Sequence, residues 1–265
     1  MKRTVVFVLL TLMIAALFAP AALAATQYDK VGEYSEGMAL VWLNGKCGFI
    51  NEKGKEIVPP KYESALAFRG GMARVKLNGK FGFVNKAGKE VVKPKYDDAD
   101  EFYDGIVRIK LGDKWGYVNT KGKEITKIKY DGAWNASGGN AKVTLNGKSG
   151  VIDNKGKEII PPKYDSFLDF RDGMARVYLN GKFGFVSKAG KEVVKPKYDD
   201  ADEFYDGLAR FKLGDKWGYV DKKGKEIVPA KYDKAWNFSG GRAQVGLDGK
   251  LGYIDKKGKV VVPLS

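Results

Sequence analysis

The only side chains dense enough to suggest chemistry in this sequence are carboxylates, because the usual catalytic alternatives are missing. The chain has no histidine and a single cysteine, Cys47. This composition excludes Ser-His-Asp and Cys-His nucleophilic systems, histidine-bearing zinc sites and thiolate metal clusters. The glycines stand in hairpin turns, so no phosphate-binding loop that opens a helix is present either. We therefore expect no catalytic residues, no cofactor and no metal site.

Two acidic groups are the candidates for an exception. They comprise Asp97, Asp98, Asp100, Glu101 and Asp104, and their copies Asp199, Asp200, Asp202, Glu203 and Asp206. Glycoside hydrolysis needs one asymmetric carboxylate pair in a cleft, whereas these groups recur in a repeated linker. Calcium binds oxygen ligands on loops, but the spacing lacks the order of ligands of an EF-hand. The favoured interpretation is a solvated acidic loop that faces lysines, with calcium as the alternative.

The leading binding hypothesis depends on aromatic side chains at repeat positions that are not aromatic in every copy. These are Trp42, Trp134, Trp236, Tyr103, Tyr178 and Tyr205. Exposed aromatic faces beside lysines would suit sugars of cell-wall polymers or aromatic-rich peptides. The rival hypothesis is a purely structural spacer in which the same rings belong to the core.

These residues are set in seven tandem copies of a 34-residue repeat. The shared glycine of each copy defines repeats 1 to 7 in order, namely Gly48, Gly82, Gly116, Gly150, Gly184, Gly218 and Gly252. Fixed periods of this length indicate a repeat architecture. A second period of 102 residues is superimposed, since residues 72–104 recur at 174–206 with two differences. A ligand pocket would therefore be expected in every third repeat.

Each repeat is predicted to be a three-stranded β-meander. Residues 72–77 alternate between apolar and charged side chains, and Asn78-Gly79 is a strong signal for a two-residue hairpin turn. A second strand over 80–85 and a glycine-rich turn follow, then a third strand from residue 90 that Pro94 limits. Residues 96–105 are expected to form a loop or one helical turn.

Two kinds of repeated residue are assigned to packing. A glycine inside a strand allows a neighbouring backbone or ring to approach closely, which explains the shared glycine of every copy. Trp115 and Trp217 precede that glycine in two copies and are expected to fill the gap between stacked units.

Two arrangements of the seven units fit this pattern. A repeat of 34 residues is short for a four-stranded propeller blade, which favours an open, curved superhelical array. The terminal copies lack the polar caps of an open array, and residues 28–29 could complete the last repeat, which favours a closed seven-unit ring. We predict the open array, with the ring as the alternative.

The N-terminal segment 1–24 is predicted to be a cleaved secretory signal. Lys2 and Arg3 precede an apolar run over 5–18, and Ala22-Leu23-Ala24 has the small residues that a signal peptidase requires. The run is shorter than the roughly 20 residues that span a bilayer. The repeat array is thus expected over residues 25–265, without a transmembrane anchor, in a secreted protein or one of the periplasm or cell envelope.

The charge balance favours anionic partners. Without Lys2 and Arg3, the 47 basic residues fall to 45 against 32 acidic ones, which is a net charge of +13. Nucleic acid is not expected, because the chain is predicted to be exported and its lysines are spread evenly through the repeats. The expected partner is a protein or a polymer of the cell envelope.

The motif Leu-x-x-Lys-Trp-Gly-Tyr-Val-Asn/Asp at 111–119 and 213–221, followed by Lys-Gly-Lys-Glu-Ile, resembles the bacterial WG (or KWG) repeat family. The resemblance covers the whole predicted mature chain. Five copies replace the tryptophan, with Cys47, Phe81, Ser149, Phe183 and Leu251. The family implies β-rich tandem arrays with interaction roles and no general catalytic residues. We therefore expect a non-catalytic binding or scaffolding surface.

Overall fold

The computed structural model describes residues 28–265, and within that range the regular structure consists of β-strands without helices. The all-β prediction is confirmed. The predicted signal segment 1–24 lies outside the described residues, so its cleavage stays a prediction.

A β-hairpin forms the centre of every repeat. In repeat 2, β6 (Met72–Leu77) pairs antiparallel with β7 (Lys80–Asn85). Asn78 and Gly79 join them with φ angles of 51° and 73°, which is the left-handed geometry that a type I′ turn requires. The equivalent hairpins are β2 (Met38–Leu43) with β3 (Lys46–Asn51), β10 (Ile106–Leu111) with β11 (Lys114–Asn119), β13 (Asn140–Leu145) with β14 (Lys148–Asp153), β17 (Met174–Leu179) with β18 (Lys182–Ser187), β21 (Leu208–Leu213) with β22 (Lys216–Asp221), and β25 (Arg242–Leu247) with β26 (Lys250–Asp255).

The third strand runs past the proline that was expected to limit it. β8 (Glu90–Tyr96) pairs with β7 through a bulge, and Pro94 lies in that bulge. A Cβ atom on Gly82 would lie 2.5 Å from the Val92 carbonyl oxygen and 2.6 Å from the Pro94 nitrogen. The shared glycine thus makes room for the bulged backbone. The equivalent strands are β4 (Glu56–Tyr62), β15 (Glu158–Tyr164), β19 (Glu192–Tyr198), β23 (Glu226–Tyr232) and β27 (Val260–Val262).

A short fourth strand adds to the predicted meander. β9 (Asp98–Ala99) pairs with β10 inside the stretch that was expected to be a loop or a helical turn. Its counterparts are β1 (Lys30–Ser35), β5 (Ser64–Ala65), β12 (Gly132–Ala133), β16 (Ser166–Phe167), β20 (Asp200–Ala201) and β24 (Lys234–Ala235). Residues 28–265 therefore form seven antiparallel sheets, one per repeat, of which six have four strands and one has three.

The three-stranded sheet belongs to repeat 3, whose third strand is irregular. Thr126 stands where the preceding repeat has the buried Val92. Its hydroxyl accepts a hydrogen bond from the Tyr117 backbone N–H at 2.9 Å, so the side chain competes with the strand ladder. Only isolated bridges, Trp115 to Tyr130 and Val118 to Glu124, remain.

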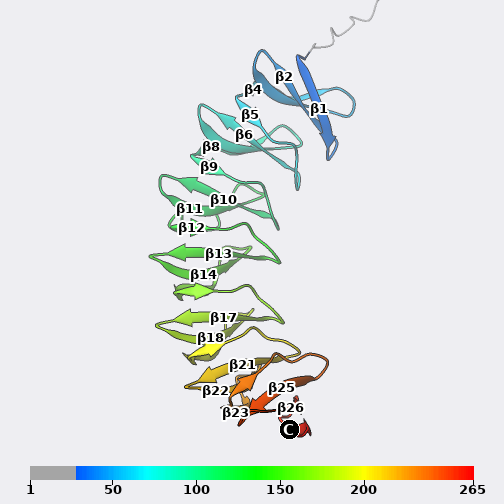
Figure 1. Ribbon diagram of the computed structural model, residues 1–265. Helices are drawn as coiled ribbons and strands as arrows, with labels where there is room; N and C mark the ends of the chain where they lie inside the picture. Colours follow the sequence, from blue (N-terminus) through cyan, green and yellow to red (C-terminus); the bar gives the residue numbers. More distant parts are fainter. Residues whose placement is uncertain (1–27) are drawn as a thin grey trace, which may run out of the picture.

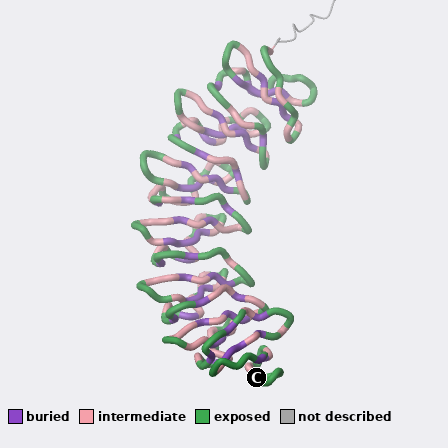
Figure 2. The backbone as a smooth tube through the Cα atoms, viewed as in Figure 1, coloured by how far each residue is buried: buried purple, intermediate pink, exposed green. Residues whose placement is uncertain are grey.

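The sheets stack in an open, curved array whose two ends lie far apart (Figure 1), so the array is not a closed ring. Buried residues run along the middle of the stack and exposed residues occupy the turns (Figure 2). The core lies between successive repeats: Phe83 of repeat 2 meets Phe102 of repeat 3 edge to face, with 5.0 Å between ring centroids. Each repeat therefore buries its apolar face only against its neighbours.

A polar ladder also joins successive repeats. Glu90 of repeat 2 accepts hydrogen bonds from the Tyr62 hydroxyl at 2.7 Å and the Lys61 amine at 2.8 Å, both in repeat 1. The same contacts recur at Lys95, Tyr96 and Glu124; Lys129, Tyr130 and Glu158; Lys163, Tyr164 and Glu192; and Lys197, Tyr198 and Glu226. Lys61 and Tyr62 hold the pKa of the Glu90 carboxyl below its usual range, whereas burial and then Glu90 raise the pKa of the Tyr62 phenol.

Candidate binding surfaces

Many lysines are neutralised by carboxylates in fixed positions. Lysines at the hairpin turns pair with the aspartate that follows the third strand, as Lys80 does with Asp97. This pairing, followed by a hydrogen bond from the Gly112 N–H, lowers the pKa of the Asp97 carboxyl. The other pairs are Lys114 with Asp131, Lys148 with Asp165, Lys182 with Asp199, and Lys216 with Asp233. These lysines and those of the Tyr-Glu ladder contribute little free charge.

Lysines of the turn between the second and third strands are different. They are exposed, and among them only Lys86 and Lys222 form ion pairs within residues 28–265. We give the name lysine edge to twelve of the unpaired lysines: Lys53, Lys55, Lys89, Lys121, Lys123, Lys155, Lys157, Lys191, Lys223, Lys225, Lys257 and Lys259. These turns therefore repeat unpaired positive charge at the same position of successive repeats.

The local fold holds these turns in register. The Asn85 side-chain oxygen accepts hydrogen bonds from the backbone N–H groups of Ala87 and Lys89, at 3.1 and 3.0 Å. Gly88 has a φ of 78°, and a Cβ atom there would lie 2.4 Å from the Ile57 carbonyl oxygen of the preceding repeat. The turn thus rests directly on its neighbour. Stacked sheets lie about 10 Å apart, close to the screening length of about 8 Å at physiological salt, so a long polyanion could contact several turns at once.

The aromatic residues singled out in the sequence occupy three positions of the repeat. Trp42 lies in β2 with the Lys30 amine 5.0 Å from its ring centroid, and Tyr178 lies in β17 against Phe183 at 4.8 Å. Both rings are half-buried. They pack along their own sheets.

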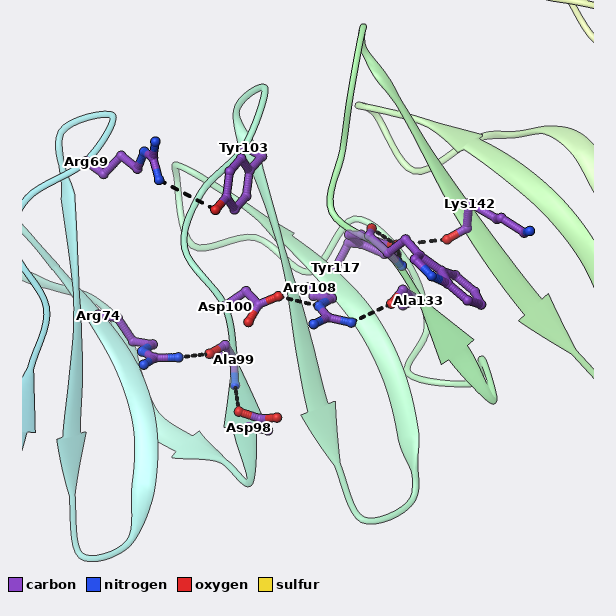
Figure 3. A network of polar contacts seen from close by, with 11 residues as sticks. Arg69, Arg74, Asp98, Ala99, Asp100, Tyr103, Arg108, Tyr117, Ala133 and Lys142 are labelled. Atoms are coloured by element: carbon purple, nitrogen blue, oxygen red, sulfur yellow. Dashed lines mark hydrogen bonds and ion pairs between the residues drawn. The ribbon is translucent and has the colours of Figure 1, made fainter. Parts of the chain in front are cut away.

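Tyr103 and Tyr205 are held by arginines of the preceding repeat. The guanidinium of Arg69 donates a hydrogen bond to the Tyr103 hydroxyl at 3.5 Å (Figure 3), and Arg171 donates one to Tyr205 at 3.2 Å. The Arg171 guanidinium carbon lies 4.1 Å from the Tyr205 ring centroid. These two rings therefore join repeats.

Four tryptophans lie nearer the surface than core residues do. Trp134 and Trp236 follow the short strands and are 45% and 41% exposed. Trp115 and Trp217, which were expected to fill the gap between units, are half-buried in their sheets. The Arg108 guanidinium carbon lies 4.7 Å from the Trp115 ring centroid, and the ring also packs against the buried cluster that repeats 3 and 4 share.

A groove of about 470 Å³ lies between repeats 4 and 5. Trp134, Asn135, Asn140 and Lys142 line it from repeat 4, and Phe170 and Lys188 line it from repeat 5. Of the six aromatic residues predicted to bind a ligand, only Trp134 lines this groove.

The groove arises where the aromatic packing between repeats changes. Val151 stands where repeats 2 and 5 have Phe83 and Phe185. Phe170 is half-buried and pairs at 5.3 Å with Phe167, which stands where repeats 2, 3, 4, 6 and 7 have alanine. The junction three repeats earlier holds the pair Phe49 and Phe68 at 4.9 Å, so the groove residues do not follow the 102-residue period. The sequence signal that was missed is this local departure from the repeat.

The acidic groups serve as bonding partners. Asp100 pairs with Arg108 at 2.5 Å, and Glu101 pairs with Arg69 at 2.8 Å. The Asp98 side chain accepts a hydrogen bond from the Ala99 N–H (Figure 3). Across residues 28–265, no three His, Cys, Asp or Glu side chains are grouped so as to hold a metal ion.

Residues 28–265 also contain no helix with the length and hydropathy to cross a lipid bilayer.

The family model described as "WG containing repeat" matches almost the whole chain. The matched segments are 23–47, 48–81, 81–115, 115–148, 150–183, 183–217, 217–250 and 252–264. No curated protein matches the sequence.

Three solved structures show a weak likeness to this chain. A structure titled "Crystal structure of the eukaryotic initiation factor" has a TM-score of 0.38 at 11% identity, covering 88% of this chain and 75% of that one. Hsv2p of Kluyveromyces lactis has a TM-score of 0.32 at 11% identity, covering 89% and 98%. PorZ of Porphyromonas gingivalis, titled a surface component of the type-IX secretion system, has a TM-score of 0.29 at 12% identity, covering 86% and 38%. These TM-scores are too low to indicate a common fold.

Proposed function

The chain belongs to the family of WG containing repeats, and we propose that it is an exported, non-catalytic scaffold that binds an anionic polymer of the cell envelope along its lysine edge. One observation supports this proposal: the twelve lysines of the lysine edge have no carboxylate partner in the described chain, while five lysines of the first turn are paired. Unpaired cations keep their charge available for an external anion.

The repeat supplies the multivalency that weak surface contacts need. A single exposed ion pair is worth about 0–1 kcal/mol, so one lysine cannot hold a polymer. Several lysines at a fixed spacing convert later contacts into intramolecular ones and raise the avidity. A linear polymer with regularly spaced negative charges, such as teichoic acid or lipopolysaccharide, fits this arrangement. The rival role, a structural spacer, would make no use of the free lysines.

The test compares two sets of charge variants that remove the same number of lysines. The edge variant replaces Lys89, Lys121, Lys123, Lys155 and Lys157 by Gln, and the matched control replaces the paired lysines by Gln. The control positions are Lys80, Lys114, Lys148, Lys182 and Lys216. Binding to teichoic acid and to lipopolysaccharide is measured at two salt concentrations for folded variants. We expect the edge variant to lose nearly all binding, the control to lose much less, and binding of the parent to weaken steadily with salt.

Four results would contradict the proposal. Equal losses in both variants would mean that net charge alone attracts the polymer. Salt-independent binding, or complete loss when Lys121 and Lys123 alone are replaced, would mean that a discrete pocket recognises it. A parent chain that binds neither polymer at low salt would favour the spacer role.

A further inference from the structure

Lys188 lines the groove between repeats 4 and 5 without a carboxylate partner. The equivalent Lys86 pairs with Glu36 at 3.3 Å, and Lys222 pairs with Asp172 at 3.5 Å. At the corresponding position before Lys188 the chain has Gly138, whose Cβ position would lie 3.9 Å from the lysine amine. Within the described residues, Lys188 forms no ion pair, so its charge faces the groove.

Asp169 has lost its usual partner at the same junction. Its equivalents Glu101 and Glu203 form ion pairs with Arg69 and Arg171 of the preceding repeats, at 2.8 and 3.1 Å. The residue at that arginine position before Asp169 is Ser137. Asp169 and Ser137 both line the groove, and the Asp169 carboxylate makes no ion pair in the part of the chain described here. Lys188 and Asp169 therefore both line this groove without a partner of opposite charge.

Trp134 and the neighbouring amides complete the groove. The Trp134 ring is 45% exposed, and the Lys142 amine lies 5.3 Å from its centroid. The same amine donates a hydrogen bond to the Phe167 carbonyl oxygen at 3.4 Å, which holds the lysine against the ring. The side-chain amides of Asn135 and Asn140 make no hydrogen bond to residues 28–265 and are free to bond a ligand.

We propose that this groove binds a saccharide that carries a carboxylate. The apolar face of a sugar ring suits the exposed indole, and its hydroxyl groups suit Asp169 and the two amides as hydrogen-bond partners. The carboxylate supplies the anion that Lys188 lacks, in a charge-assisted hydrogen bond. A volume of about 470 Å³ lies within the range of about 300–1,000 Å³ typical of small-ligand sites.

Each simpler ligand would leave part of this groove unused. A neutral sugar would leave Lys188 unpaired, and a short aliphatic acid would leave Trp134 uncovered. The site does not depend on the lysine edge, because none of the lysines of that edge lines it.

The experiment titrates the full chain with glucuronic acid, with glucose and with an acidic tripeptide, followed by tryptophan fluorescence and calorimetry. Saturable binding of glucuronic acid at one equivalent is expected, with glucose weaker by about tenfold, as for the loss of one charge-assisted hydrogen bond. Lys188→Gln should weaken glucuronic acid by about the same factor and leave glucose unchanged. Trp134→Ala should weaken both sugars.

A filled-groove variant provides the structural control. Val151→Phe combined with Phe167→Ala restores the residues of the junction where Phe185 and Phe204 pack at 4.9 Å. It should melt no lower than the parent, bind glucuronic acid at least tenfold more weakly, and retain the polymer binding of the lysine edge. The edge variant should bind glucuronic acid as the parent does and should lose the polymer binding. The proposal is overturned if glucuronic acid does not saturate the parent, if glucose or the tripeptide binds as tightly, or if the filled groove binds unchanged.

Discussion

Truncation of Phe102 tests whether the junctions between repeats hold the array together. This ring is 6% exposed and meets Phe83, which is 1% exposed, edge to face at 5.0 Å. Replacing a buried phenylalanine by alanine costs about 3–5 kcal/mol. About 0.5–1.5 kcal/mol of that loss reflects the aromatic pair itself. Phe102→Ala should therefore weaken the junction between repeats 2 and 3 more than any surface change in either repeat.

The matched control is Phe170→Ala, at the same position of repeat 5. Phe170 is half-buried beside the groove, so its truncation should cost about 1–2 kcal/mol. Urea unfolding is followed by far-ultraviolet circular dichroism and by tryptophan fluorescence. Because repeats contact only their neighbours, Phe102→Ala should lower the midpoint or split unfolding into two steps. Equal midpoint shifts for both variants would refute the reasoning, as would a Phe102→Ala chain that unfolds like the parent.

Three further predictions concern pH and processing. Hydrogen bonds from lysine and tyrosine lower the pKa of Glu90 and Glu124, so their contribution to stability is present above the unfolded pKa of about 4.3 and is lost as pH falls through the lower folded value. Melting temperatures at pH 7, 4 and 2 should decrease in that order. Burial raises the pKa of Tyr96 and Tyr164, so their contribution is complete below the unfolded pKa of about 10 and is lost above it; a melting temperature that stays constant from pH 9 to 11.5 would contradict this. The exported protein should begin near Ala25, and an intact mass that still includes residues 1–24 would disprove cleavage.

The features that sequence could predict are those encoded within a few residues. Asn78-Gly79 specifies its turn locally because both residues must adopt positive φ, and the alternation of apolar and charged residues specifies the two strands beside it. The short strand Asp98–Ala99 has no such pattern, since two residues cannot show a period and their pairing depends on the position of β10. Pro94 was expected to limit its strand, but the bulge opposite Gly82 places it where no ladder donor is needed.

The lysine edge required the structure because charge pairing in this fold is not local. Lys61 pairs with a carboxylate 29 residues away, and Lys80 pairs with one 17 residues away. Lys89 is followed directly by Glu90, yet the Glu90 carboxylate bonds to Lys61 and Tyr62 of the previous repeat. A count of basic and acidic residues gives the excess of charge without showing which lysines carry it.

The groove shows why departures from a repeat are more informative than the repeat itself. Each shared residue makes a contact that recurs at every junction. The common glycine, for example, allows two backbones to approach closely, and a buried ring packs between units. A substitution that breaks the pattern at one junction removes a contact there and leaves its former partner free. Three residues at the junction of repeats 4 and 5 differ in this way from their counterparts three repeats earlier: Val151 from Phe49, Phe167 from Ala65, and Asp169 from Ala67. All three residues line the groove beside Trp134. A search for ligand sites in such arrays should therefore begin at junctions where several residues differ from the repeat pattern.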